Sequence, residues 1–417
     1  MSLRQTWSSL SLRLTRLLHI DVTFYAKSIV WIVVAHSTGI IRGVATTFLM
    51  GRWLAPQTFG QFRYILAVFG IAGIFSLTGI NQSVIRGIAK GDTVIAWAAF
   101  KRILSVSPLG SAILLLAAAE RLWRGESIVA AGLAGVALLF PFYSVSGLYG
   151  PILNGKGEVT KLMKIAIMNN LVFSLCFVLI ITHTKHLLPV LLAYLGFDIL
   201  FRGSLTWHEI CRLPKVGTPT EHLRLGTHLS GISAMQALAS QLDQILIQYV
   251  GGYGTLASYS IATLIPEQIK DLANSWNGII LRRFSQYQKN QETLRATKRH
   301  FWLTFLLSAI IVGCYAILIP LFLPRLFPQY QNQVLPSIIY SLGLLAMPAM
   351  IGLNYFQAHN QIRALWRFNI VNAMLQISSN LVLIPLFGSW GAILSKTLTR
   401  FGSTMFAYPT EIKQEAR

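Results

Sequence analysis

The sequence is poor in charge, and poorest in acidic residues. Charged residues make up 12% of its 417 positions, against about 25% in a typical soluble domain. Only 14 Asp and Glu stand against 35 Lys and Arg, which gives a formal net charge of +21. In a soluble protein that imbalance would suggest nucleic acid. Hydrophobic residues occupy 54% of this chain, however, and cytoplasmic loops of membrane proteins collect Lys and Arg, so we expect no nucleic-acid partner.

Cysteine and catalytic motifs are equally scarce. The three cysteines, Cys176, Cys211 and Cys314, are widely separated in or beside apolar runs, which predicts neither a disulfide framework nor a metal site. The sequence contains no GxxxxGK[ST] loop, HExxH helix or GxSxG elbow. His183 and His186 have an HxxH spacing but lie at a span boundary. We therefore expect no cofactor, no metal and no enzyme activity, and an ion or substrate gradient as the energy source.

Long apolar runs dominate what is present, among them VFSLCFVLII and LLSAIIVGCYAILIPLFL. Continuous runs of this kind predict helices rather than the short alternating strands of a barrel. The fold class we predict is an all-α polytopic membrane protein. Its twelve expected spans are 27–50, 60–82, 104–119, 127–149, 163–182, 186–204, 228–249, 255–279, 301–323, 334–356, 366–386 and 389–408. The third is interrupted by Ser105, Ser107, Pro108 and Gly110.

The positive residues set the orientation. With both termini in the cytoplasm, the outer loops hold only Arg52, Arg121, Arg124, Lys185 and Arg325. Every other cation in a loop then lies on the cytoplasmic side, as the positive-inside rule requires. The outer loops are short and leave no room for a periplasmic domain. Residues 1–26 are basic and amphipathic and lack the long apolar region of a cleaved signal peptide.

The chain divides near its middle into two similar halves. We expect an amphipathic cytoplasmic N-terminus at 1–26, a six-helix bundle at 27–204, a cytoplasmic linker at 205–227, a second bundle at 228–408 and a tail at 409–417. Asn154–Asn170 resembles the segment 203 positions later, and GQFRYILA from Gly60 resembles ASYSIATL 197 positions later. Parallel six-helix repeats are a known transporter plan, with the substrate site between the halves.

Several charged residues fall inside the predicted spans, where each costs roughly 2.5–3.5 kcal/mol on insertion scales. Arg42 is central, which favours a function, whereas Arg63 lies close to the outer face and could snorkel. Glu267 and Lys270 have the spacing of a structural ion pair. The full set is His36, Arg42, Arg63, Asp243, Glu267, Lys270, Asp271, Lys396 and Arg400.

Three spans also carry one polar face each, which suggests helices that line a hydrated cavity. The alternative is that these side chains hydrogen-bond between helices; for the third face, which has no charge, both interpretations stay open. The faces consist of Ser233, Gln236, Ser240, Asp243 and Gln244; of Ser260, Thr263, Glu267, Lys270, Asp271 and Asn274; and of Asn369, Asn372, Gln376, Ser379 and Asn380.

Three segments carry a resemblance to a known family. The first span ends in Leu54-Ala55-Pro56 and is followed by Phe59-Gly60-Gln61-Phe62, and the second ends with Gly79, Asn81 and Gln82 before Arg86. SQLDQILIQYVGGYGTLASYSIATLIPEQI and PLFGSWGAILSKTLTR add weaker matches in the second half. These features resemble the polysaccharide (O-antigen or exopolysaccharide) flippases of the multidrug/oligosaccharidyl-lipid/polysaccharide exporter superfamily.

The resemblance implies a V-shaped, alternating-access bundle of two six-helix halves in a bacterial inner membrane. It further implies an undecaprenyl-diphosphate-linked oligosaccharide as substrate, moved from the cytoplasmic to the periplasmic leaflet. Membrane lipid, a coupling proton or sodium ion and other polysaccharide assembly proteins are the expected partners. Twelve spans favour an O-antigen, capsule or exopolysaccharide unit, because relatives that act on peptidoglycan precursor usually have fourteen.

We assign the expected roles on this basis. Arg42, Arg63, Lys270, Lys396 and Arg400 would bind the anionic headgroup; His36, Gln236, Ser240, Gln244, Asn369, Asn372 and Gln376 would line the cavity; and Asp243, Glu267 or Asp271 would take the coupling ion.

Two alternative functions stay open. A multidrug or cation antiporter of the same superfamily would more naturally have an anionic, aromatic-lined cavity, and a central Arg42 argues against it. A membrane polysaccharide polymerase or ligase usually needs a large periplasmic loop, which the short outer loops do not provide.

Overall fold

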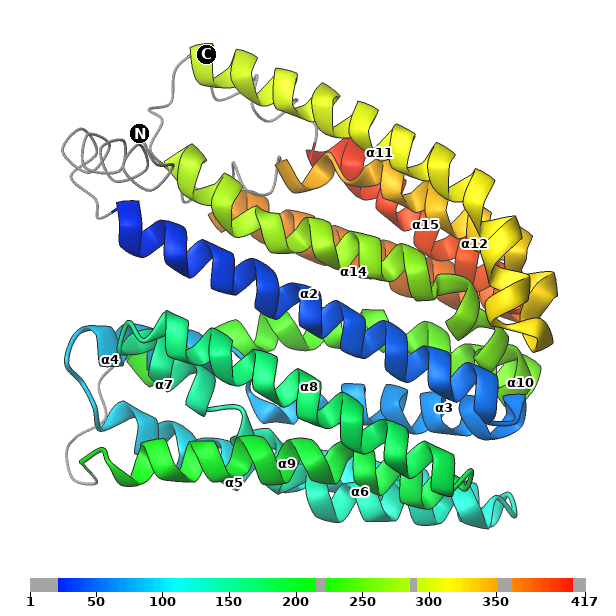
Figure 1. Ribbon diagram of the computed structural model, residues 1–417, viewed down its shortest axis with the longest axis horizontal. Helices are drawn as coiled ribbons and strands as arrows, with labels where there is room; N and C mark the ends of the chain where they lie inside the picture. Colours follow the sequence, from blue (N-terminus) through cyan, green and yellow to red (C-terminus); the bar gives the residue numbers. More distant parts are fainter. Residues whose placement is uncertain (1–21, 215–221, 286–290, 352–361, 408–417) are drawn as a thin grey trace, which may run out of the picture.

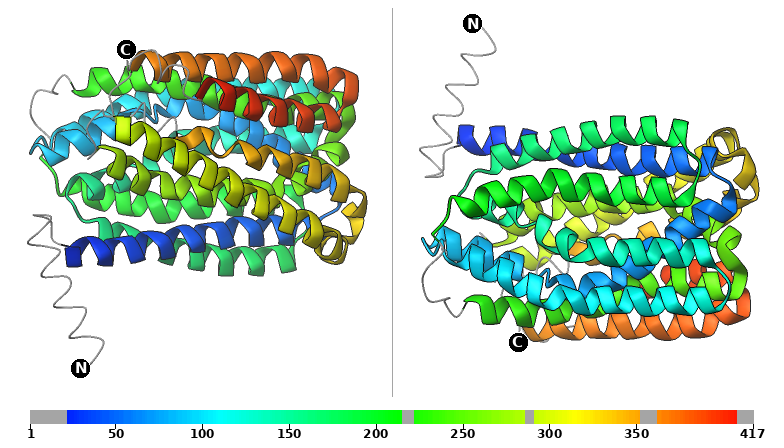
Figure 2. Two further views of the ribbon diagram at one scale, coloured as in Figure 1. Left: turned by 90° about the horizontal axis from the view of Figure 1, so that it is seen from above. Right: turned by 90° about the horizontal axis from the view of Figure 1, so that it is seen from below.

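The computed structural model describes residues 22–214, 222–285, 291–351 and 362–407, and these residues form helices and their connections without a strand. The helices run side by side along one axis in all three views (Figure 1, Figure 2). The first part contains α2 (Val22–Trp53), α3 (Pro56–Ala72), α4 (Ile80–Ala89), α5 (Ile95–Trp123), α6 (Ser127–Ser146), α7 (Tyr149–Gly155), α8 (Val159–His183) and α9 (Leu187–Cys211). The second contains α10 (His222–Ser285), α11 (Gln291–Leu326), α12 (Val334–Leu342), α14 (Ile362–Phe387) and α15 (Ser389–Ala407). Short 3₁₀ segments η1 (Gly73–Ser76), η2 (Pro328–Gln333) and η3 (Gly343–Ala346) interrupt or extend them.

The described chain makes the twelve membrane passes that the sequence predicts. Within the described residues, nine segments are long and apolar enough to cross a membrane by length and composition. The 64 residues of α10 would extend about 96 Å as a straight helix, far more than the hydrocarbon thickness of about 30 Å. Gly252, with φ 75°, instead divides α10 into two limbs. These limbs and α15 supply the other three passes, and the protein is a multi-pass membrane protein.

The third predicted span proves to be an unbroken helix rather than an interrupted one. α5 runs through Pro108 from Ile95 to Trp123. The hydroxyls of Ser105 and Ser107 donate to carbonyls one turn back in the same helix, which is how polar residues are accommodated in membrane helices. A Cβ at Gly110 would lie 2.3 Å from Cε1 of Phe140. The glycine is therefore required for close packing of α5 on α6, and is not a helix break.

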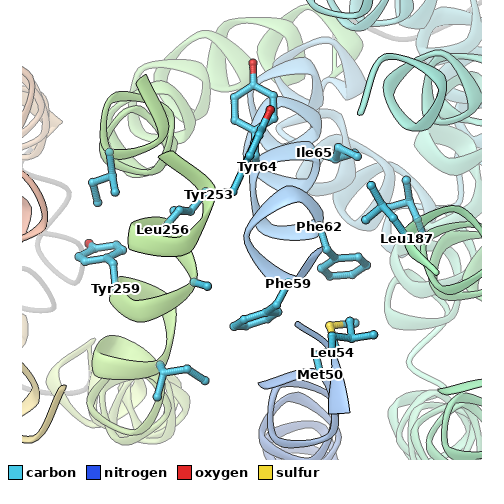
Figure 3. Close-up of a cluster of buried hydrophobic side chains, with 14 of the residues drawn as sticks. Met50, Leu54, Phe59, Phe62, Tyr64, Ile65, Leu187, Tyr253, Leu256 and Tyr259 are labelled. Carbon is cyan, nitrogen blue, oxygen red and sulfur yellow. The ribbon is translucent and has the colours of Figure 1, made fainter. Parts of the chain in front are cut away.

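Helix α10 joins two groups of helices. In Figure 1, α5, α6, α8 and α9 gather on one side and α11, α12 and α15 on the other. The two limbs of α10 pack against α2, α3 and α4 of the first part of the chain and against α12, α14 and α15 of the second part. Buried apolar side chains fill this junction, where α3 with Phe59 lies beside the segment of α10 that carries Leu256, while Phe62 points to the other side, toward Leu187 (Figure 3).

One pair of helix starts has the spacing of the sequence repeat. α3 begins at Pro56, and the second limb of α10 follows the Gly252 kink at Tyr253, 197 positions later. The predicted domain limits stay predictions, although α9 extends to Cys211 and α10 starts at His222, so both helices enter the expected linker.

Candidate functional site: two cationic cavities between the halves

One cavity, of about 450 Å³, is bordered by α2, α3, α9 and the second limb of α10. We call it the N-half cavity. Nη2 of Arg42 is 2.9 Å from Oδ2 of Asp198, and Nε of Arg202 is 3.6 Å from Oδ1 of the same carboxylate. The Arg42 guanidinium also lies over the ring of Phe173, 3.5 Å from its centroid. Asp198 thus lies between two arginines, and a charge in this low-dielectric setting needs such partners.

A second cavity, of about 420 Å³, is bordered by α10, α14 and α15. We call it the C-half cavity. Nζ of Lys396 lies 2.8 Å from Oδ2 of Asp243, whose side chain is fully buried. Glu267 forms ion pairs with Lys270 and with Arg400. The predicted Glu267–Lys270 pair is therefore confirmed, and Arg400 joins it.

Arg63 lines both cavities, together with Thr263 and Glu267. Its Nε donates to Oγ of Ser260 and its Nη2 to Oε1 of Gln244, both at 3.1 Å. Among the described residues it forms no ion pair with a carboxylate. Arg63 therefore points into the junction of the two halves, and does not snorkel toward the outer face.

The polar faces combine both interpretations that the sequence left open. Ser240 and Gln244 of α10 and Asn372 and Gln376 of α14 line the C-half cavity. Further along α14, Ser379 and Asn380 instead hydrogen-bond to Ser395 of α15 at 2.6 Å each and hold the two helices together. The Gln236 amide donates to Asn369 Oδ1 at 2.8 Å, across α10 and α14. The side chains of Ser233 and Asn274 lie outside the described residues.

His36 and Asp271 lie apart from the two cavities. They border a third hollow of about 560 Å³ between α2 and the second limb of α10. Its wall on α2 is formed by small residues, including Gly39 and Gly43, and its wall on α10 by Gln268. We call this hollow the side opening.

The sequence did not single out Asp198, Arg202 or Tyr340 as site residues. Asp198 and Arg202 occur one turn apart in the middle of α9, a spacing that places both on one face. Tyr340, on α12, donates its hydroxyl hydrogen to Glu267. A tyrosine in an apolar run carries no signal of its own, so only the packing of α12 against α10 reveals it.

Arg121 was expected in an outer loop, and this expectation was wrong. Its side chain is only 1% exposed, because its guanidinium lies over the rings of Tyr64 of α3 and Tyr249 of α10. Its guanidinium donates to Tyr64 Oη at 3.1 Å and to Gln248 Oε1 at 2.8 Å, and it pairs with Glu120 at 2.9 Å and Glu126 at 3.2 Å. Arg121 thus ties the first group of helices to α10 at the end of the bundle where α10 turns.

Comparison with known proteins identifies the family. The sequence pattern described as "Polysaccharide biosynthesis protein" matches residues 25–288. The chain belongs to this family. The resemblance seen in the sequence is therefore confirmed, although no curated protein sequence matches the chain.

Solved structures of the same fold are transporters. "Lipid II flippase MurJ, inward closed conformation" aligns with a TM-score of 0.74 at 14% identity, over 92% of this chain and 87% of that one. The inward-facing "multidrug resistance MATE family transporter of the MOP superfamily" aligns with a TM-score of 0.67 at 14% identity, over 88% and 93%. These similarities confirm the predicted helical transporter fold.

Proposed function

We propose that the protein is a flippase that carries undecaprenyl-diphosphate-linked oligosaccharide units from the cytoplasmic to the periplasmic leaflet of a bacterial inner membrane. The observation that carries this proposal is Arg63, a cation at the junction of both cavities whose partners are a hydroxyl and an amide. A phosphate oxygen can replace those neutral partners without leaving a buried carboxylate unpaired. Charge-assisted hydrogen bonds of this kind are about twice as strong as neutral ones.

The surroundings of Arg63 suit the rest of the headgroup. Arg42 and Arg202 stand on the N-half side of it, and Lys270, Lys396 and Arg400 on the C-half side. The amides of Gln244, Asn372 and Gln376 offer donors and acceptors to sugar hydroxyls.

Asp243 is the carboxylate that best suits a coupling proton. Its Oδ2 accepts from Tyr259 and contacts Lys396, whereas the buried Oδ1 has no hydrogen-bond partner among the described residues. A proton on Asp243 would neutralise it and release the Lys396 ammonium toward the cavity. Glu267 and Asp271 are the other candidates, and sodium is the other candidate ion.

The cavity disfavours a cation antiporter. Asp198, Asp243 and Glu267 each pair with at least one Arg or Lys, so a cationic drug would have to displace a protein cation. We also place both termini in the cytoplasm, so that the end closed by Arg121 faces the periplasm.

Gene deletion tests the proposal. We expect loss of surface glycan, accumulation of complete lipid-linked units on the cytoplasmic side, and rescue by the wild-type gene but not by Arg42→Ala at equal membrane level. Normal surface glycan in a strain without a redundant transporter would overturn the proposal. Loss of toxic-cation efflux instead would favour the antiporter, and restored chain growth in a reconstituted assay that needs no flipping would favour the polymerase.

A further inference from the structure

The two cavities hold more positive charge than negative charge. Among the described residues, six cationic side chains line the cavities and three carboxylates line them or contact those cations, which leaves three positive charges. The cations are Arg42, Arg63, Arg202, Lys270, Lys396 and Arg400, and the carboxylates are Asp198, Asp243 and Glu267. Asp271 borders the side opening and lies outside this count.

The three excess charges occupy three separate places. In the N-half cavity, Asp198 lies between Arg42 and Arg202. In the C-half cavity, Glu267 lies between Lys270 and Arg400. Each group has two cations to one carboxylate and so carries one excess positive charge. The third belongs to Arg63, while Lys396 and Asp243 balance each other.

The diphosphate headgroup of the proposed substrate neutralises only two of these three excess positive charges. In a lipid–diphosphate–sugar conjugate both phosphates are esterified, so the diphosphate carries two negative charges. One excess cation would then stay uncompensated in a cavity inside the membrane, where isolated charges are costly. A third negative charge is expected from the cargo itself, and the glycan is the only part of that conjugate that can supply it.

The position of this third charge follows from the cavity walls. A diphosphate held by Arg63 and the Arg42–Asp198–Arg202 group occupies the N-half cavity and the junction. The sugars then extend into the C-half cavity, whose wall is rich in amides and hydroxyls: Ser240, Gln241, Gln244, Asn372, Gln376 and Ser403. The excess cation on that wall belongs to the Lys270–Glu267–Arg400 group.

We propose that the glycan carried by this protein is acidic, and that a carboxylate on one of its sugars binds at Lys270 and Arg400 in the C-half cavity. This inference rests on the proposed function and narrows its substrate class to lipid-linked units that contain a uronic acid or another carboxylated sugar. The contact adds one charge-assisted hydrogen bond or more, each worth about 1.5–3 kcal/mol, which corresponds to a preference of about tenfold or more over the neutral sugar.

The test compares two ligands that differ in one carboxylate. Farnesyl-diphosphate-linked glucuronic acid and farnesyl-diphosphate-linked glucose are titrated at one salt concentration into the purified full-length protein in nanodiscs of neutral lipid. The wild-type protein should bind the glucuronate ligand about tenfold more tightly. Lys270→Gln should reduce this ratio of affinities to near one, chiefly by weakening the binding of the glucuronate ligand. Lys90→Gln removes the same charge from an exposed residue outside both cavities and should leave the ratio unchanged.

The outcomes separate the two proposals. Equal binding of both ligands by the wild-type protein would overturn the acidic-sugar inference and leave the flippase proposal standing. A preference that persists in Lys270→Gln, or that Lys90→Gln abolishes as well, would also overturn the acidic-sugar inference. Either result would mean that the carboxylate does not bind specifically at Lys270. If neither ligand binds, while the protein remains folded by its melting curve, the flippase proposal itself fails.

Discussion

Gly60 of α3 lies directly against the backbone of Tyr253 at the start of the second limb of α10. A Cβ at position 60 would fall 1.9 Å from the Tyr253 carbonyl oxygen, a distance that no side chain can occupy. The two groups of helices approach backbone to backbone at this point, close to the Gly252 kink. The same contact brings Tyr64 and Tyr253 together above it (Figure 3), with ring centroids 5.8 Å apart.

Gly60→Ala should therefore separate α3 from α10 and destabilise the protein. Overpacking typically costs about 1–3 kcal/mol, and here the clash is with backbone, which cannot rotate away. We expect a lower melting temperature in detergent and a lower membrane level. Gly196→Ala is the matched control, since a Cβ there meets nothing within 4 Å. Equal melting temperatures for the two variants would contradict the close approach.

Arg63→Gln should lower glycan export by about tenfold to a hundredfold, since a lost charge-assisted hydrogen bond is worth about 1.5–3 kcal/mol. The glutamine can still bond to Ser260 or Gln244, so the protein should remain at its normal membrane level. Arg325→Gln, at an exposed position, removes the same charge and should export normally. Export rates per unit of membrane protein check this, and equal rates in both variants would remove Arg63 from the binding site.

Arg121→Ala should open the end of the bundle where α10 turns. The substitution removes the Arg121 partner of Glu126, which keeps its hydrogen bond from Tyr253, and it removes the bond to Gln248. Labelling of a Ser260→Cys reporter by a membrane-impermeant maleimide added from outside should rise several-fold in the Arg121→Ala background. The comparison uses a parent chain from which Cys176, Cys211 and Cys314 have been replaced. Unchanged labelling would show that Arg121 stabilises the fold without controlling access.

Asp243 and Lys396 should be strongly coupled in stability. Removing one partner of a buried ion pair leaves the other charge uncompensated and costs about 3–5 kcal/mol. Asp243→Asn and Lys396→Met should each lower the melting temperature markedly, and the double variant should recover much of the loss. Thermal melts of the wild type, the two single variants and the double variant form a double-mutant cycle that measures this coupling. Additive losses would mean that the pair does not interact in the folded protein.

Features that depend on local composition could be predicted from the sequence. Apolar run lengths predicted the twelve passes, and the 197-residue shift between the repeats reappears between the start of α3 and the start of the second limb of α10. Lys270 and Glu267 were paired correctly because their spacing within one helix fixes their proximity. The cations Arg42, Arg63, Lys396 and Arg400 were noticed because charge is conspicuous in an apolar run.

Features that depend on tertiary packing could not be predicted. Arg121 looked like a loop residue because it follows a long apolar run, and only its contacts with Tyr64 of α3 and Gln248 of α10 show that it is buried. Asp198 binds a partner 156 positions away in the chain. Pro108 looked like a break because the sequence does not show that Ser105 and Ser107 hydrogen-bond within their own helix, or that α6 packs against it.

The hydrogen bonds of Arg63 have a thermodynamic consequence for the empty protein. The donor lies on α3 and both acceptors lie on α10, so these bonds hold the two halves together when the cavity contains no anion. An anion that binds the Arg63 guanidinium replaces these hydrogen bonds and so weakens the contact between the halves. By thermodynamic reciprocity, separation of the halves strengthens anion binding by the same factor. An unloaded flippase of this design would resist rearrangement, which limits the dissipation of an ion gradient in cycles that move no cargo.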